Sequence, residues 1–531
     1  MKKKKNLLSA VTILTLMLSM VFAPHRAAQA SSTYMDGKLT ISGFVKQQMQ
    51  IRTEMPAAER QFHSTNVDFF QTSGMLETLY KIRDCPDYSI SFFGGVKAWW
   101  QESIYYDHKM SNAIPRDERQ NWTVPRNFEK DVLTEAYIDY IRGPWQVRLG
   151  KQILVWGQLD LERVADVVNP LDIRRGPPGV NTWEEIKLGL WMIRTLYQSQ
   201  LPGDLLFEAV INPGDFKPME LPYEGTQPGV PASQVRFFNP KVQKFGIYYW
   251  NREKWSRDAP DGWNLRKNWE VGFRVRGNTW DVDWTLLYWN ARDDTPVADP
   301  GKIGPFNNEF IFSGIATAAT GRWVAPQWPS YKVYSYKRYQ TVGGTAQTFL
   351  PKLWKTVWRL EWFYEINRPM NKATRGDPAA IYGVTKRNVL GIAVQCGKTF
   401  NIPWFTRSFI ANSAMTDISF TYGWEKVFNY DRDLVIDSRN HSWKNSSNEV
   451  ITGFLMQPLF HQSFMFIFVG NYYLRIQKWQ AIPVLSYAFP GNHWRADLGY
   501  AAFGGAKQPW VETNGSMKNN DYILLRLRYE F

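Results

Sequence analysis

His461 and Ser463 are a pair of residues whose types and spacing could support hydrolysis. Two positions apart on a strand, their side chains would share one face, as a general base and a hydroxyl nucleophile require. The pair lies in a stretch expected to be a short turn, and no nucleophile elbow, phosphate-binding loop or dinucleotide fingerprint occurs in the chain. The histidines are scattered, so no metal cluster can be read. We therefore expect neither an enzyme nor a cofactor.

A second group of candidate residues occupies the segment 157–188, which is rich in charge, proline and glycine. Such a segment could fold into a pore and narrow it, because opposed acids and bases select solutes by charge. The alternative is a solvated external loop, whose surface ion pairs contribute little. The charged candidates are Asp160, Glu162, Arg163, Asp166, Asp172, Arg174 and Arg175.

The elements that would position such residues are clearest in Tyr522–Phe531, where apolar and polar residues alternate. A period of two sustained over about 10 residues is typical of one tilted strand of a transmembrane barrel. In the reverse orientation, arginines would face hydrocarbon at a cost of roughly 2 to 4 kcal/mol each near the midplane. We therefore expect Arg526 and Arg528 to face inward, and the outward set to be Ile523, Leu525, Leu527, Tyr529 and Phe531.

The same alternation recurs at 269–288 and 352–366, with tryptophans on the outward face. The polar face would line a lumen, where it could attract anionic or polar solutes or form an ion-paired lining. The wall residues with inward parity are Arg148, Arg274, Arg276, Arg359, Arg526 and Arg528, together with Asp281, Asp283, Glu361 and Glu365.

Connection lengths support a barrel, since outer-membrane barrels alternate short periplasmic turns with long extracellular loops. Counting strands in this way predicts an all-β fold, a single transmembrane antiparallel β-barrel of about 18 strands, within a range of roughly 16 to 20. A soluble multi-sheet β-protein is the alternative, but its outward face should be polar. The short turns are predicted near 84–87, 142–145, 201–204, 239–240, 277–279 and 490–493.

The N-terminus has the organisation of a secretory signal peptide. Lys2–Lys5 are basic, 7–22 is apolar, and Ala28–Ala30 provides a small-residue cleavage site. We therefore expect a signal peptide at 1–30 and an outer-membrane β-barrel at 31–531.

Composition is consistent with an exported barrel. Aromatic residues make up 16% of the chain and could form interfacial girdles. The formal net charge is +14, and export argues against nucleic acid as the partner of this basic chain. Cys85 and Cys396 are too few for a disulfide scaffold, and the sequence leaves open whether they pair.

Two resemblances add to this interpretation. Leu525, Leu527, Tyr529 and Phe531 resemble the C-terminal signal that the barrel-assembly machinery recognises in outer-membrane proteins. The resemblance implies that this machinery is a partner of the chain.

The second resemblance lies in RLGKQILVWGQLDLERVADVVNPLDIRRG, residues 148–176, followed by 205–216 and 246–251. The motif is similar to a proteobacterial outer-membrane family called domain of unknown function 1302, distantly similar to alginate-export-type porins. Gln158 departs from the acidic residue common in that family. The matching residues, which add Gln152 and Asn169 to the lumen or constriction candidates, are Arg148, Gly150, Gln152, Trp156, Gly157, Asn169, Pro170, Asp172 and Arg174.

The sequence thus predicts an outer-membrane, porin-like channel for passive passage of a small organic or lipid-related solute. A structural or adhesive barrel is the alternative, and an outer-membrane lipid hydrolase is a weaker one. Expected partners are outer-membrane lipids, lipopolysaccharide and the barrel-assembly machinery, and the resemblance leaves room for a periplasmic carrier or an inner-membrane transporter. Substrate and direction of transport stay open.

Overall fold

The structure is a computed structural model. It describes residues 31–531 except 54–64, 103–123, 126, 161–162, 173–181, 220–262, 296, 299–333, 374–380, 402–414, 436–445, 476, 492 and 506–520. Within these limits, no helix is both long and apolar enough to cross a membrane. The signal peptide expected at 1–30 lies outside the described residues and stays a prediction.

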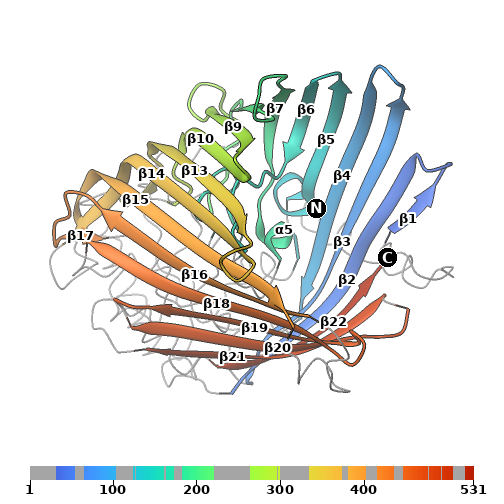
Figure 1. The fold of residues 1–531 in the computed structure, drawn as a ribbon. Coiled ribbons are helices and arrows are strands. Elements are labelled where there is room, and N and C mark those ends of the chain that lie inside the picture. Colours follow the sequence, from blue (N-terminus) through green and yellow to red (C-terminus); the bar gives the residue numbers. More distant parts are fainter. Residues whose placement is uncertain are drawn as a thin grey trace, which may run out of the picture.

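The strands form one closed antiparallel barrel of 18 strands, which confirms the predicted fold class. They follow one another round the ring in sequence order, and β22 (Tyr522–Glu530) pairs with β2 (Leu39–Arg52) to close it, as Figure 1 shows. The other barrel strands are β3 (Val67–Asp84), β4 (Ser89–Gln101), β5 (Leu133–Arg142), β6 (Trp145–Gln152), β7 (Leu190–Gln198), β8 (Leu206–Asn212), β9 (Glu270–Thr279), β10 (Val282–Arg292), β13 (Arg338–Leu350), β14 (Thr356–Ala373), β15 (Ile381–Phe400), β16 (Thr416–Val427), β18 (Ser447–Leu459), β19 (Phe464–Tyr473), β20 (Lys478–Ala488) and β21 (Trp494–Gly505).

A few short elements accompany the barrel. β1 (Ser31–Tyr34) pairs with β2, and β17 (Leu434–Val435) pairs with β14. β11 (Val297–Ala298) and β12 (Tyr334–Ser335) form a separate two-stranded sheet. The described helices are equally short: a π-helix, η1 (Phe128–Val132), and α5 (Trp183–Ile186).

Side-chain exposure alternates along the strands as the period of two predicts. On β9, Phe273 is 52% exposed, whereas Arg274 beside it is 6% exposed. On β22, Leu525 and Leu527 are exposed and Leu524 is buried. The outward positions therefore form an apolar surface that includes Leu149, Ile193, Ile211, Phe273, Leu286, Phe420, Ile451, Leu498, Leu525 and Leu527.

Short connections lie where predicted between β3 and β4, β5 and β6, β7 and β8, and β20 and β21. The turn predicted at 239–240 falls outside the described residues. The turn predicted at 277–279 is wrong, because β9 continues to Thr279 and the turn consists of Trp280 and Asp281. Both turn residues have positive φ, 54° and 60°, which is the backbone of a type I′ hairpin turn.

Packing explains the glycine that suggested the wrong turn. A Cβ at Gly277 would lie 2.7 Å from Cζ2 of Trp284, so this position needs glycine under an indole ring rather than at a bend. Asp281, predicted to face the lumen from the wall, instead lies in the exposed turn. Cys85 and Cys396 are free thiols.

Candidate functional site

Residues 153–189 connect β6 to β7, and the described part of this connection, 153–160, 163–172 and 182–189, enters the barrel; we call this described part the lumen segment. Its first attachment is to β14, where the Glu361 carboxylate accepts hydrogen bonds from the backbone N–H groups of Leu159, at 2.7 Å, and Ala165, at 2.9 Å. The N–H of Gln158 donates to the same carboxylate. Glu361 is fully buried, so its acceptor capacity is used by the segment.

The second attachment is to strands on the other side of the ring. Glu185 of α5 forms an ion pair with Lys46 of β2 at 2.6 Å, and its carbonyl oxygen accepts a hydrogen bond from Lys97 of β4 at 3.3 Å. Burial alone would raise the pKa of Glu185, but the charge and hydrogen bond of Lys46 and the Thr182 N–H lower it to about 2. Since β2 and β14 lie apart round the ring in Figure 1, the segment spans the lumen between them.

Polar contacts also hold the segment together internally. Asn169 accepts a hydrogen bond from the Leu154 N–H at 2.7 Å and donates to the carbonyls of Gln152, at 3.2 Å, and Leu188, at 2.8 Å. Asp166 forms a buried ion pair with Lys187. These bonds tie both ends of the segment to one another, which fixes its path where it leaves and rejoins the wall.

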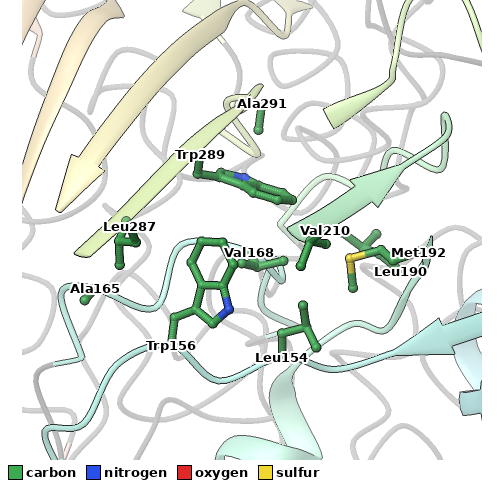
Figure 2. Close-up of a cluster of buried hydrophobic side chains, with 10 residues drawn as sticks. All are labelled: Leu154, Trp156, Ala165, Val168, Leu190, Met192, Val210, Leu287, Trp289 and Ala291. Carbon is green, nitrogen blue, oxygen red and sulfur yellow. The ribbon is translucent and has the colours of Figure 1, made fainter. Parts of the chain in front are cut away.

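An apolar cluster packs the segment against the inner face of the wall (Figure 2). The rings of Trp156, from the segment, and Trp289, from β10, meet edge to face, with centroids 5.6 Å apart and planes at 84°. Around them lie buried residues of β7, β8, β10 and the segment: Leu154, Ala165, Val168, Leu190, Met192, Val210, Leu287 and Ala291. This part of the barrel interior is therefore filled with apolar side chains.

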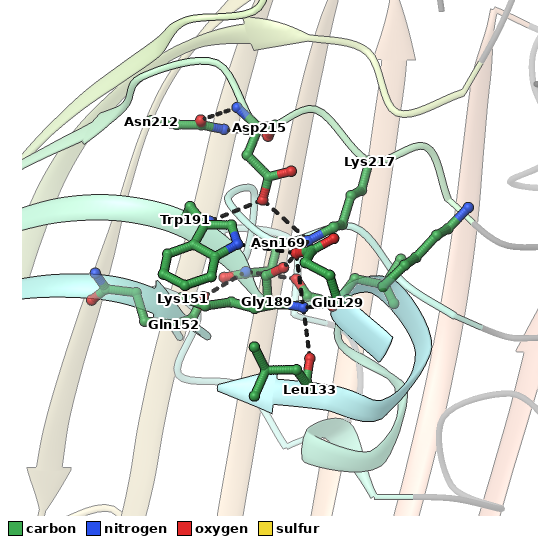
Figure 3. Close-up of polar contacts among 12 residues, drawn as sticks. Glu129, Leu133, Lys151, Gln152, Asn169, Gly189, Trp191, Asn212, Asp215 and Lys217 are labelled. Atoms are coloured by element: carbon green, nitrogen blue, oxygen red, sulfur yellow. Dashed lines mark hydrogen bonds and ion pairs between the residues drawn. The ribbon is translucent and has the colours of Figure 1, made fainter. Parts of the chain in front are cut away.

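An ion cluster gathers around Lys217 and Lys151 near the end of the lumen segment (Figure 3). Lys217 donates hydrogen bonds to Glu129 of η1 at 2.8 Å, to Asp215 at 3.1 Å and to the Gly189 carbonyl at 2.9 Å. Lys151 of β6 forms a second ion pair with Glu129 at 3.2 Å. Burial alone would raise the pKa of Glu129, but the two lysine charges lower it below its ordinary value. The cluster joins the connections before β5 and after β8 to the base of the lumen segment.

Arginines surround an open recess beneath the start of the lumen segment. Glu208 of β8 accepts from Arg194 of β7, Nε to Oε1, at 2.7 Å, and from Arg274 of β9, Nη2 to Oε2, at 2.6 Å. Arg276, farther along β9, lines the same cavity, whose volume is about 320 Å³. Residues 153–158 of the segment form its other side. Three arginines thus line this cavity, which we call the arginine recess, and Glu208 bridges two of them, Arg194 and Arg274.

Several predicted site residues form pairs of their own. Arg148 pairs with Asp139 of β5 at 2.8 Å. Arg359 of β14 pairs with Asp160 of the segment at 3.3 Å. Arg163 donates from Nε to the Leu159 carbonyl at 3.0 Å.

The remaining predicted residues have other surroundings. Gln152 is buried and donates to the Met192 carbonyl at 3.0 Å. Asp172 is buried, and its N–H donates to the Ile186 carbonyl. Asp283 accepts a hydrogen bond from Asn278 across the β9–β10 hairpin at 2.7 Å. Glu162, Arg174 and Arg175 lie outside the described residues.

Sequence reasoning missed the partners that complete these arrangements. Lys46, Glu185, Glu208, Arg194 and Lys217 were not among the predicted site residues. Glu208 and Arg194 have inward parity in their strands, which was an available signal. Lys46 also has inward parity on β2, whereas Glu185 and Lys217 depend on how distant segments meet, for which the sequence provides no local pattern.

The residues of the predicted insertion signal lie at the closure of the barrel. Leu525 and Leu527 are exposed outward, whereas Tyr529 and Phe531 are buried. Phe531 exchanges backbone hydrogen bonds with Gly43 of β2 at 2.9 and 3.0 Å. Recognition of these four C-terminal residues by the barrel-assembly machinery stays a prediction.

The hydrolase pair lies in a tight turn. His461 has a positive φ of 59°, and Ser463 closes the turn by donating its N–H to the Phe460 carbonyl. The turn joins β18 to β19, so the two side chains do not share a strand face. In the described part of the chain, no group of three or more His, Cys, Asp or Glu residues could hold a metal ion.

Comparison with solved structures returns porins at low sequence identity. The chain is similar to Salmonella typhi OmpF in complex with daunomycin, with 10% identity, a TM-score of 0.43, and 94% of this chain and 100% of that chain covered. Acinetobacter baumannii OccAB3 has 8% sequence identity and a TM-score of 0.45, with 93% of this chain and 99% of that chain covered. Pseudomonas aeruginosa OccK8 (OprE) has 7% sequence identity and a TM-score of 0.46, with 94% of this chain and 99% of that chain covered.

Sequence comparison, unlike the comparison of structures, identifies a family for the chain. No curated protein sequence matches the chain. The sequence pattern of the family described as "Protein of unknown function (DUF1302)" matches residues 9–437, which include the lumen segment and the strands that hold it. The chain belongs to this family of unknown function.

Proposed function

We propose that the protein is an outer-membrane channel for the passive passage of a small organic or lipid-related solute. The observation that carries the proposal is a closed barrel with an apolar outer surface, whose lumen is lined by charged residues and crossed by an anchored segment. An apolar outer face suits hydrocarbon, because a closed sheet leaves no unpaired backbone edge there. Outer-membrane lipids and lipopolysaccharide would then contact that face. The barrel-assembly machinery would insert the barrel into the membrane.

The lumen segment supports selective rather than open passage. Its attachments to β2 and β14 use charged side chains of the wall, so the free cross-section is divided rather than empty. Selection in pores arises where charged side chains approach one another across a narrow space. A periplasmic carrier or an inner-membrane transporter would deliver or collect the solute.

Single-channel conductance of the purified protein in planar bilayers tests the proposal. We expect discrete conductance steps smaller than those of an unobstructed barrel of this strand number. A silent barrel that inserts without conducting would favour the structural or adhesive alternative. No covalent chemistry is proposed, and an assay of fatty-acid release with Ser463→Ala as control tests the hydrolase alternative directly.

A further inference from the structure

We propose that the arginine recess binds the carboxylate group of a small organic anion. The inference rests on the proposed channel function and names the class of solute that the channel would take. It starts from the recess itself, which is an open cavity of about 320 Å³ between strands β7 and β9 and residues 153–158. This volume is at the small end of the range of ligand sites, roughly 300 to 1,000 Å³.

The charge in the recess is not balanced by the residues that line it. Both oxygens of Glu208 are occupied: Oε1 accepts from Arg194 at 2.7 Å and Oε2 from Arg274 at 2.6 Å. Trp156 also approaches Oε1 through Nε1 at 3.4 Å. Glu208 is therefore a fixed bridge between two guanidinium groups and is not available to neutralise a third.

Arg276 supplies that third charge. It is exposed to the cavity and forms no ion pair with any acid in the described part of the chain. Arg148, the nearest arginine on β6, is already paired with Asp139. An anion in the recess would meet an uncompensated guanidinium that can donate two parallel hydrogen bonds to a carboxylate.

The recess, one side of which is formed by the lumen segment, is mainly polar. The Trp156 indole is buried there, and the guanidinium carbon of Arg274 covers it at 5.5 Å from the ring centroid. Gln158 lines the cavity, and its Oε1 is buried with no hydrogen-bond donor among the described residues. A ligand with a carboxylate for Arg276 and a neighbouring donor for Gln158 would satisfy both residues.

Calorimetric titration of the full-length protein in detergent tests the inference, with benzoate as the probe and benzamide as its neutral counterpart. We expect benzoate to bind more tightly than benzamide. Arg276→Gln should weaken benzoate binding by about tenfold, the order expected for losing one charge-assisted hydrogen bond. Benzamide binding should not change.

Arg495→Gln is the matched control. Arg495 lies on β21 two residues from the buried Asp497, so it faces the lumen, is exposed, and forms no ion pair with a described acid. This variant should bind benzoate like the unaltered protein. Equal binding of benzoate and benzamide, equal loss in both variants, or equally tight binding of inorganic phosphate would each overturn the inference.

The titration requires no transport, so it separates this inference from the proposed function. A barrel that is silent in planar bilayers but binds benzoate through Arg276 would overturn the channel alone. A conducting barrel without preference for benzoate would overturn the recess alone. The circular dichroism of each variant, and the heat needed to unfold it on a gel, show whether the barrel is intact.

Discussion

The carboxylate of Glu361, on the wall strand β14, accepts a hydrogen bond at 2.7 Å from the backbone N–H of Leu159, which is 202 positions away in sequence. The same carboxylate also holds Ala165. One buried acid of the wall therefore determines where the lumen segment crosses the pore.

Removing this acid should loosen the segment. Glu361→Ala leaves buried N–H groups without an acceptor, at a cost of about 1 to 3 kcal/mol. We expect larger and noisier single-channel conductance, because the displaced segment would open the lumen. Glu449→Gln is the control, since Glu449 pairs with the half-exposed Arg475 and does not contact the segment. Identical conductance in both variants would contradict the anchoring role.

The ion pair of Lys46 and Glu185 should make this attachment sensitive to acid. The pKa of Glu185 is lowered from 4.5 to about 2 while it is paired, so its contribution is complete above pH 4.5 and is lost as pH falls through 2. We expect constant conductance from neutral pH to about pH 5 and an increase below pH 4.5. Recordings across a pH series measure this.

Lys46→Met supplies the comparison for the acid response. Without the lysine, burial would raise the pKa of Glu185, so the ionised carboxylate would weaken the attachment at neutral pH and its protonation would strengthen it. We therefore expect high conductance at neutral pH that decreases on acidification, opposite to the response of the unaltered protein. If Lys46→Met showed the same acid-induced increase in conductance as the unaltered protein, Glu185 would not hold the segment.

Gly272 on β9 should tolerate no side chain. A Cβ there would lie 2.2 Å from Trp289 and 2.8 Å from Trp156, inside the apolar cluster. Gly272→Ala should destabilise the barrel by about 1 to 3 kcal/mol through overpacking. At Gly397 on β15 the nearest atom to such a Cβ is 3.6 Å away, so Gly397→Ala should be tolerated. Thermal unfolding followed by circular dichroism compares the two, and equal stability would exclude tight packing at Gly272.

The buried lysine of the ion cluster should matter more than an exposed one. Lys217→Met leaves the buried Asp215 without its cation, which costs on the order of 3 to 5 kcal/mol for a buried pair, whereas Glu129 keeps its ion pair with Lys151. Lys81→Met removes an exposed pair with Asp84 that contributes at most about 1 kcal/mol. Unfolding in guanidinium measures both changes. Similar losses in the two variants would refute the assignment of a structural role to the cluster.

The wall could be predicted from the sequence because a strand has a fixed period. Arg274 and Glu361 face inward for the same reason that Phe273 faces outward, and this follows from parity alone. The turn between β9 and β10 was misplaced because glycine has two uses: Gly277 accommodates the ring of Trp284, while Trp280 and Asp281 adopt the turn backbone.

The arrangement inside the barrel could be predicted only in part. The composition of the lumen segment indicates that it could enter the pore, but its partners depend on contacts between distant strands. Glu185 and Lys46 are 139 positions apart in sequence, and no local sequence pattern predicts that they form a contact. Arg194 and Glu208 could have been selected by parity, yet their shared recess follows from the register of β7, β8 and β9.

The pairing of β2 with β22 also has a consequence for biogenesis. Gly43 and Phe531 exchange backbone hydrogen bonds, so the first long strand finds its second neighbour only after almost the whole polypeptide has been made. Until then two strand edges stay bare and prone to aggregation, and such distant contacts form slowly. A chain destined for the proposed outer-membrane barrel would thus need a factor that shields both strand edges until they pair.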